Sequence, residues 1–158
     1  MKLKLERPLI CFDLESTGLN ISEARIVSCC FIKIYPDGSR DTKKRLINPT
    51  IKIPLESIEI HGITDEMVKD SLTFKNVSKG LFDLISGCDL LSFNGNNYDV
   101  PLLAEEFLRC GINFPEEGTR LIDACSIFKK MHERTLTAAL RLYCNEELDW
   151  AHNAEADT

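Results

Sequence analysis

The sequence of 158 residues lacks long apolar runs, and no stretch approaches the ~20 residues that a membrane-spanning helix needs. Its first residues lack the apolar core of a signal peptide. The seven cysteines include no Cys-x-x-Cys pair, so no motif indicates a cysteine-bound metal. Scattered cysteines in odd number are typical of reduced thiols that fill apolar space. We therefore expect a cytoplasmic protein with no membrane segment and no disulfide framework.

The sequence also lacks an excess of positive charge. The chain has 19 Lys and Arg against 25 Asp and Glu, a net charge of −6, whereas nucleic-acid-binding proteins usually carry a basic face. This balance argues against a long basic groove. It does not argue against a small metal-dependent nuclease, because acids gathered at a metal site lower the charge of the apoprotein and bound cations restore positive potential there.

Length and composition predict one domain, since 158 residues with 44% hydrophobic content suffice for one full core. The order of its predicted elements makes it an α/β domain. Strands are predicted where β-branched and aromatic residues gather between turns, and helices where apolar residues recur every three or four positions. The expected strands are residues 9–15, 25–35, 41–47, 89–93 and 121–123, and the expected helices are residues 55–60, 64–68, 73–87, 98–110, 124–131, 135–143 and 151–158. The first three strands form an antiparallel β-meander, and the later ones add parallel strands to a mixed central sheet flanked by helices.

Two acids follow the apolar start of the first strand. Side chains alternate along a strand, so Asp13 and Glu15 point to the same side, with Cα atoms roughly 6.5–7 Å apart at about 3.3 Å rise per residue. Carboxylates at that spacing repel each other unless a cation lies between them. A buried acidic pair at the end of a core strand thus predicts a metal site. The alternative is that one of the two acids faces solvent at a strand edge.

Further acids and one histidine stand where such a site needs them. Asp99 begins a helix after a strand, where α/β proteins bind ligands, although the helix dipole also favours an acid there. Asp123 ends a short strand, where it could serve as a ligand, but we favour a structural hydrogen-bonding role. His152 and Asp157 are five residues apart and do not share a helix face. We expect His152 just before the last helix, where an imidazole suits general-base work, and Asp157 on the helix.

Together these segments resemble the DEDDh-type 3′–5′ exonucleases, the DnaQ-like branch of the ribonuclease-H-like fold, over nearly the whole chain. Residues 12–19 are similar to the first exonuclease motif, and residues 61–64 to the family's His-Gly-Ile segment. Residues 93–103 resemble the second motif, and residues 152–157 have the His-x4-Asp form of the third. The histidine separates this branch from the one that uses tyrosine.

The resemblance implies a two-metal nuclease. Asp13, Glu15, Asp99 and Asp157 would hold two Mg²⁺ or Mn²⁺ ions, and His152 would take the proton from the attacking water. The residues that would contact the terminal nucleotide are Leu14, Ser16, Thr17, Leu19, His61, Asn94 and Tyr98. Within this group the leucine at position 19 would wedge against the terminal base.

The sequence departs from the family at three positions and at its end. Ser16 stands where Thr is common, Tyr98 where Phe is common, and Phe93 where some members have His. Family members usually continue the last helix for several turns, whereas here only Thr158 follows Asp157. We therefore expect a single exonuclease domain over residues 1–158 that is truncated in its last helix.

The expected function is a metal-dependent 3′–5′ exonuclease that acts at the 3′ end of single-stranded DNA or RNA and releases nucleoside 5′-monophosphates. The alternative is a non-catalytic nucleic-acid-binding or polymerase-associated module on the same fold. A ribonuclease-H-like endonuclease is a third interpretation. The choice between DNA and RNA stays open, as do proofreading beside a polymerase, repair, RNA end-trimming and a homodimer partner.

Overall fold

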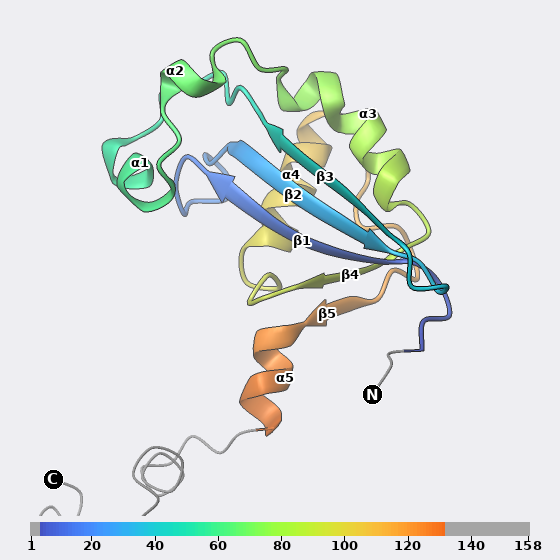
Figure 1. Ribbon diagram of the computed structural model, residues 1–158. Coiled ribbons are helices and arrows are strands. Elements are labelled where there is room, and N and C mark those ends of the chain that lie inside the picture. The colour runs from blue at the N-terminus through green and yellow to red at the C-terminus, as the bar shows by residue number, and fades with distance from the viewer. Residues whose placement is uncertain (1–3, 132–158) are drawn as a thin grey trace, which may run out of the picture. The chain divides into compact units, whose positions relative to one another are not determined.

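A mixed five-stranded sheet forms the centre of the computed structural model, which describes residues 4–131 (Figure 1). The strands are β1 (Leu9–Ser16), β2 (Ile26–Ile34), β3 (Arg40–Leu46), β4 (Asp89–Ser92) and β5 (Leu121–Asp123), in the order β3-β2-β1-β4-β5. The predicted antiparallel meander of β1, β2 and β3 is confirmed, and β4 and β5 continue the sheet in parallel. Because β1 is the central strand, its acids do not lie at a sheet edge.

The helices begin and end within two residues of their predicted bounds. They are α1 (Leu55–His61), α2 (Asp65–Val68), α3 (Phe74–Ile85), α4 (Asp99–Arg109) and α5 (Ala124–Met131). At the start of α3 the side-chain oxygen of Asn76 accepts a hydrogen bond from the Thr73 backbone N–H at 3.1 Å, as a capping box requires. The helices expected at residues 135–143 and 151–158 lie outside the described residues.

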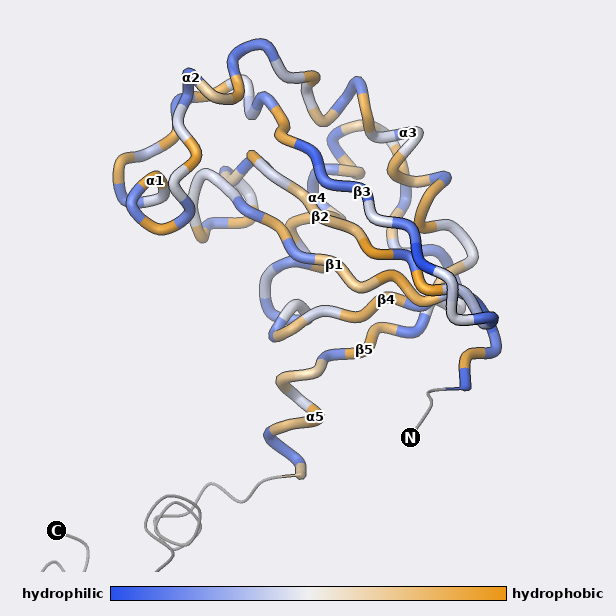
Figure 2. The backbone as a smooth tube through the Cα atoms, in the orientation of Figure 1, coloured by the Kyte–Doolittle hydropathy of each residue, from blue (hydrophilic) through white to orange (hydrophobic). Residues whose placement is uncertain are grey.

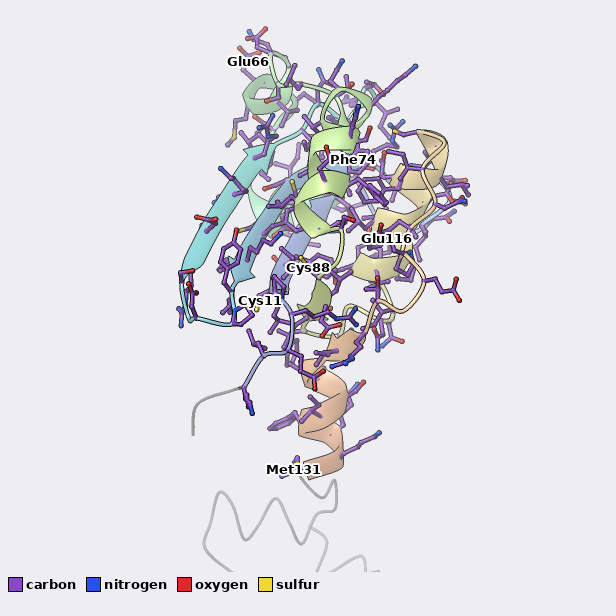
Figure 3. The ribbon with its side chains drawn as sticks, turned by 90° about the vertical axis from the view of Figure 1, so that its right-hand side faces the viewer. Cys11, Glu66, Phe74, Cys88, Glu116 and Met131 are labelled. Atoms are coloured by element: carbon purple, nitrogen blue, oxygen red, sulfur yellow. The ribbon has the colours of Figure 1, made fainter. Side chains whose placement is uncertain are left out.

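Helices α3 and α4 pack on the same face of the sheet (Figures 2 and 3). Apolar side chains from both helices form one core with those of β1, β2 and β4. Phe12 of β1 and Phe31 of β2 stack with ring centroids 5.8 Å apart. Phe74 of α3 meets Phe107 of α4 edge-on at 5.3 Å. Alternation along β1 therefore sends every second side chain into this core and the others to the opposite face.

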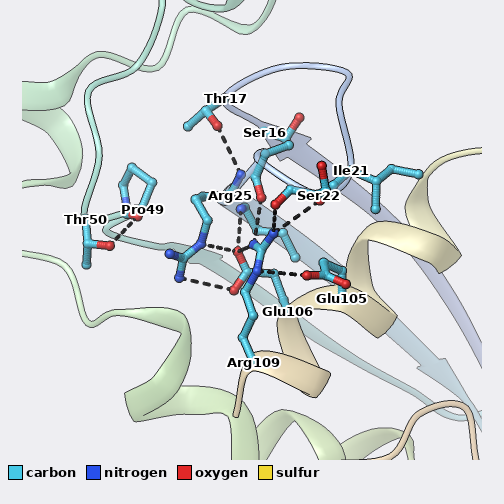
Figure 4. Close-up of polar contacts among 12 residues, drawn as sticks. Ser16, Thr17, Ile21, Ser22, Arg25, Pro49, Thr50, Glu105, Glu106 and Arg109 are labelled. Atoms are coloured by element: carbon cyan, nitrogen blue, oxygen red, sulfur yellow. Dashed lines mark hydrogen bonds and ion pairs between the residues drawn. The ribbon is translucent and has the colours of Figure 1, made fainter.

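A buried carboxylate joins α4 to the start of β2. Glu106 is 1% exposed, and its Oε1 accepts hydrogen bonds from Arg25 Nε at 2.6 Å and Arg109 Nη1 at 3.2 Å (Figure 4). Arg109 also donates to backbone carbonyl oxygens in the loop between β1 and β2, at Ile21, Ser22 and Ala24. A buried charge is tolerated only when it is paired, so these contacts hold each other in place. The loop that follows β1 is thereby attached to α4.

The contacts divide the chain into two compact units, Met1–Asp123 and Ala124–Thr158. The first contains the whole sheet together with α1 to α4, and α5 belongs to the second. The single domain over residues 1–158 stays a prediction. Over residues 4–131, no helix combines the length and apolar character needed to cross a membrane.

Glu106→Gln should lower the free energy of unfolding by about 3 kcal/mol, because it leaves two arginines at a largely buried site without their carboxylate. Glu105→Gln is the matched control. Glu105 also pairs with Arg109, at 3.2 Å, but its side chain is 31% exposed, and such pairs contribute only about 0.2–1 kcal/mol. Urea unfolding measures both losses. Equal, small losses of unfolding free energy in Glu106→Gln and Glu105→Gln would show that the buried Glu106 contributes no more than an exposed ion pair.

Candidate active site

Asp13 and Glu15 lie near the end of β1, on the face opposite the α3–α4 core. Their neighbours Phe12 and Leu14 are buried in that core. Asp13 is exposed and Glu15 is half-buried, so the predicted burial of the acidic pair is wrong for Asp13. Alternation decides which face a side chain takes, but only its packing partners decide whether that face is buried. The shared face, which the sequence predicted, is confirmed.

Asp99 is the first residue of α4 and is buried, with 9% exposure. Burial and, next, the negative charge of Asp13 raise the pKa of the Asp99 carboxyl above its ordinary value, and Glu15 adds to this rise. The backbone N–H groups of Asp99 and Leu14 oppose the rise, because they stabilise the charged form. The fold thus brings Asp99 close enough to the two acids of β1 for their charges to interact.

The loop between β4 and α4 places Asp99 through a close backbone approach at Gly95. The Gly95 carbonyl accepts hydrogen bonds from the backbone N–H groups of Tyr98 at 3.2 Å and Val100 at 2.9 Å. A Cβ atom on Gly95 would lie 1.9 Å from Ser92 Oγ and 3.4 Å from Asp99 Cβ. Only glycine fits here, so the position of Asp99 depends on this contact with β4.

The chemistry of the three carboxylates fits a divalent metal. They are the hard oxygen donors that Mg²⁺ and Mn²⁺ prefer, and a cation would relieve their mutual repulsion. Within residues 4–131, however, no three His, Cys, Asp or Glu side chains are grouped closely enough to hold a metal ion. The remaining predicted ligand, Asp157, and the predicted base, His152, lie outside the described residues. The metal site therefore stays a prediction.

A cavity of about 140 Å³ lies beside Glu15, between the end of β1, α1 and the start of α4. Five of the seven residues predicted to contact a nucleotide line it: Leu14, Ser16, Leu19, His61 and Tyr98. Gly18, Ser57 and Ile60 also line the cavity and were not predicted. Positions 57, 60 and 61 share one face of α1 at spacings of three and four, so the helical pattern around His61 could have identified the two residues of α1.

Hydrogen bonds hold two side chains of this cavity in place. The Tyr98 hydroxyl contacts Ser16 Oγ at 2.5 Å and donates to the Gly18 carbonyl, and burial raises the pKa of Tyr98, so the phenol keeps its proton at neutral pH. His61 Nδ1 accepts the Ile63 backbone N–H at 3.0 Å. The proton of the neutral His61 ring therefore lies on Nε2, which donates to the Ser16 carbonyl at 3.2 Å.

Thr17 and Asn94, which were also predicted to contact the nucleotide, do not line the cavity. Thr17 is buried, and its hydroxyl accepts the Arg25 backbone N–H at 3.0 Å. Asn94 has a positive φ of 60°, and its side-chain oxygen accepts a hydrogen bond from Asn97 at 2.8 Å. Its backbone N–H donates to Asp123 Oδ1 at 2.8 Å, which confirms the structural role predicted for Asp123.

Known proteins share this arrangement, in which Asp13 and Glu15 lie near the end of a central strand and Asp99 begins a helix. The exonuclease family model (RNase_T) matches residues 10–158. This chain belongs to the DnaQ-like DEDDh 3′–5′ exonuclease family. DNA polymerase III subunit epsilon of Haemophilus influenzae is 30% identical over 133 residues, 78% of this chain and 50% of that protein. The Pasteurella multocida subunit epsilon is 29% identical over 132 residues, which are 78% of this chain and 51% of that protein. This chain therefore spans about half the length of both relatives.

Solved exonucleases share the fold. E. coli exonuclease I in complex with a 5cy-dA13 oligonucleotide matches 95% of this chain and 33% of that chain, with a TM-score of 0.71 and 13% identity. The zinc-bound complex of E. coli exonuclease I with single-stranded DNA matches 96% and 38% of the two chains, with a TM-score of 0.71 and 14% identity. At this identity the likeness shows the fold alone, and the predicted ribonuclease-H-like fold is confirmed.

Gly95→Ala should lower the free energy of unfolding by about 1–3 kcal/mol, because the added methyl group pushes Ser92 away from the start of α4. Gly80→Ala is the matched control. Gly80 lies inside α3, where a Cβ atom meets nothing within 4 Å, so this exchange should stabilise by about 0.5–1 kcal/mol. Thermal unfolding gives the sign of both effects. A neutral or stabilising Gly95→Ala would mean that the β4–α4 loop has room for a side chain.

Proposed function

We propose that the chain is a metal-dependent 3′–5′ exonuclease that acts on the 3′ end of single-stranded DNA or RNA and releases nucleoside 5′-monophosphates. The observation that carries this proposal is the position of Glu15, whose charge interacts with that of Asp99 and whose side chain also lines the cavity. A nucleotide held in the cavity would have its phosphate near the carboxylates. A cavity of about 140 Å³ has room for part of one nucleotide at a strand end and none for a duplex.

Asp13, Glu15 and Asp99, with Asp157 as the fourth ligand, would hold two Mg²⁺ or Mn²⁺ ions. Bound there, the ions would lower the pKa of a water molecule and stabilise charge on the leaving oxygen. His152 would accept the proton of the attacking water. The water oxygen bonds to phosphorus while the bond from phosphorus to the 3′-oxygen of the preceding nucleotide breaks. The shortened strand keeps a 3′-hydroxyl, and the released nucleotide keeps its 5′-phosphate.

The residues around the cavity would position the terminal nucleotide. Leu19 and Ile60 line it and are each 85% exposed, and a bound base would cover these two apolar side chains. His61 and Tyr98 supply aromatic rings of the kind on which bases stack. Leu14 and Ser16 would contact the nucleotide from β1. Thr17 and Asn94 would act indirectly, by shaping the loops that carry the lining residues.

The names of the relatives extend the proposal to substrate and partners. The subunit epsilon relatives belong to DNA polymerase III, which favours a polymerase as a partner of this chain, with a second copy of the chain as the other candidate. The E. coli exonuclease I structures contain single-stranded DNA, which favours DNA over RNA as substrate. We place the protein in the cytoplasm, where such partners would be found.

Incubation with a 5′-labelled single-stranded oligonucleotide and Mn²⁺ should give a ladder that shortens from the 3′ end and disappears in EDTA. Asp13→Asn should reduce the rate by about 100-fold or more, because it removes charge that stabilises the reacting centre. Asp83→Asn, at an exposed acid of α3, is the matched control and should keep the wild-type rate.

Three results would overturn the proposal. Wild-type activity of Asp13→Asn would exclude the acidic site, and cleavage of a circular strand would indicate an endonuclease. Metal-dependent binding of a 3′ end without any cleavage would favour the non-catalytic binding module. Parallel assays on DNA and RNA strands of the same sequence decide which sugar is preferred.

A further inference from the structure

The edge strand β3 concentrates positive charge in an acidic protein. Arg40, Lys43, Lys44 and Arg45 are all exposed, and Asp41 is the only acid among the seven residues of the strand. Figure 2 shows β3 as the most hydrophilic strand of the meander. The net charge of the chain is −6, so this strand differs in sign from the molecule as a whole.

The cations of β3 are not neutralised by neighbouring acids. Within residues 4–131 none of the four takes part in an ion pair, whereas every arginine of that part outside β3 does. Asp41 accepts a hydrogen bond from the Tyr35 hydroxyl at 2.9 Å and is engaged there. Unpaired cations on one strand create a local positive potential that attracts a polyanion.

The strand register divides these cations between the two faces of the sheet. Lys44 lies opposite Cys30, which lies opposite Asp13, so Lys44 shares the face of the catalytic acids. With strands about 4.8 Å apart, the Cα atoms of Lys44 and Asp13 are about 10 Å apart. Arg40 is on the same face, four residues and therefore about 13 Å farther along the strand.

The other two cations of β3 face the opposite way. Lys43 pairs with Phe31 and Arg45 with Cys29, so both point to the side of the sheet that α3 covers. There they line a separate cavity of about 360 Å³ together with residues of α3. One strand thus carries two pairs of cations that are equal in charge and differ in the face they occupy.

We propose that Arg40 and Lys44 bind phosphates of the single strand upstream of its 3′ end. The inference rests on the proposed exonuclease function, because the scissile phosphate at Asp13 fixes where the strand begins. From there a strand that crosses β2 passes over half-buried Cys30 and Ile32 and reaches the two cations. Phosphate contacts of this kind give affinity without sequence preference.

Cations on an edge strand also discourage pairing with the edge of another molecule. Prevention of edge pairing would depend equally on the cations of both faces. Phosphate binding beside Asp13 depends only on Arg40 and Lys44. A comparison of the two pairs therefore separates the two explanations.

The test is the salt dependence of kcat/KM for a thymidine oligonucleotide and for the thymidine dinucleotide, whose one phosphate occupies the active site. The difference between the two slopes of log kcat/KM against log salt reports the upstream contacts alone. In R40Q/K44Q this difference should fall by about 1.4, since each phosphate contact to a single strand contributes about 0.7. The control K43Q/R45Q should match wild type, and R40K/K44R should restore the slope.

The inference would be overturned if the slope difference were the same in R40Q/K44Q as in wild type, or if it fell equally in K43Q/R45Q. In either case cleavage by the wild-type protein would still support the exonuclease function. Absence of cleavage in the wild-type protein with either substrate would instead overturn the proposed function. Urea unfolding of each variant confirms that the folded states are compared.

Discussion

The buried carboxylate of Glu106 lies between two arginine side chains, and the arrangement of the site depends on this contact. Glu106 and Arg109 are on α4, and the same helix begins with Asp99. Arg25 stands at the start of β2, and Arg109 reaches three carbonyl groups of the loop that follows β1. That loop carries the residues after Glu15 that line the cavity. The start of α4 thus carries Asp99, next to Tyr98. The other end of α4 holds the loop after β1, whose residues line the cavity beside them.

The site gathers like charges, and such a group is unfavourable without a cation. Asp13 and Glu15 share a face of a central strand, and their charges add to the effect of burial in raising the pKa of Asp99. Contacts elsewhere hold the three acids in place despite their repulsion. These contacts are the core around Phe12, the close approach at Gly95 and the ion pairs of Glu106. The same protein leaves four cations of β3 unpaired within residues 4–131. Charge is therefore distributed unevenly over the sheet. The acids would bind metal ions, and the cations of β3 would contact a polyanion.

Within residues 4–131, local patterns in the sequence were enough to predict the strands and helices to within about two residues, because periodicity and turn residues act over short distances. They also gave the shared face of Asp13 and Glu15. The exposure of Asp13 could not be predicted, since it depends on which face of the sheet α3 and α4 cover. The Arg25–Glu106 pair joins residues far apart in the sequence, and no local pattern reports such a contact. Thr17 and Asn94 matched a motif, yet local hydrogen bonds use their polar groups. The predictions for His152 and Asp157 fall on residues outside the described part.

We propose that the acids of β1 and α4 form one metal site beside a nucleotide cavity. Anomalous diffraction at the manganese edge, from crystals grown with Mn²⁺ and a nucleoside 5′-monophosphate, tests it most directly. We expect manganese bound to the carboxylates of Asp13 and Asp99, with the base in the cavity beside Leu19 and Tyr98. Manganese bound only at other residues, with both of these carboxylates free of metal, would contradict it.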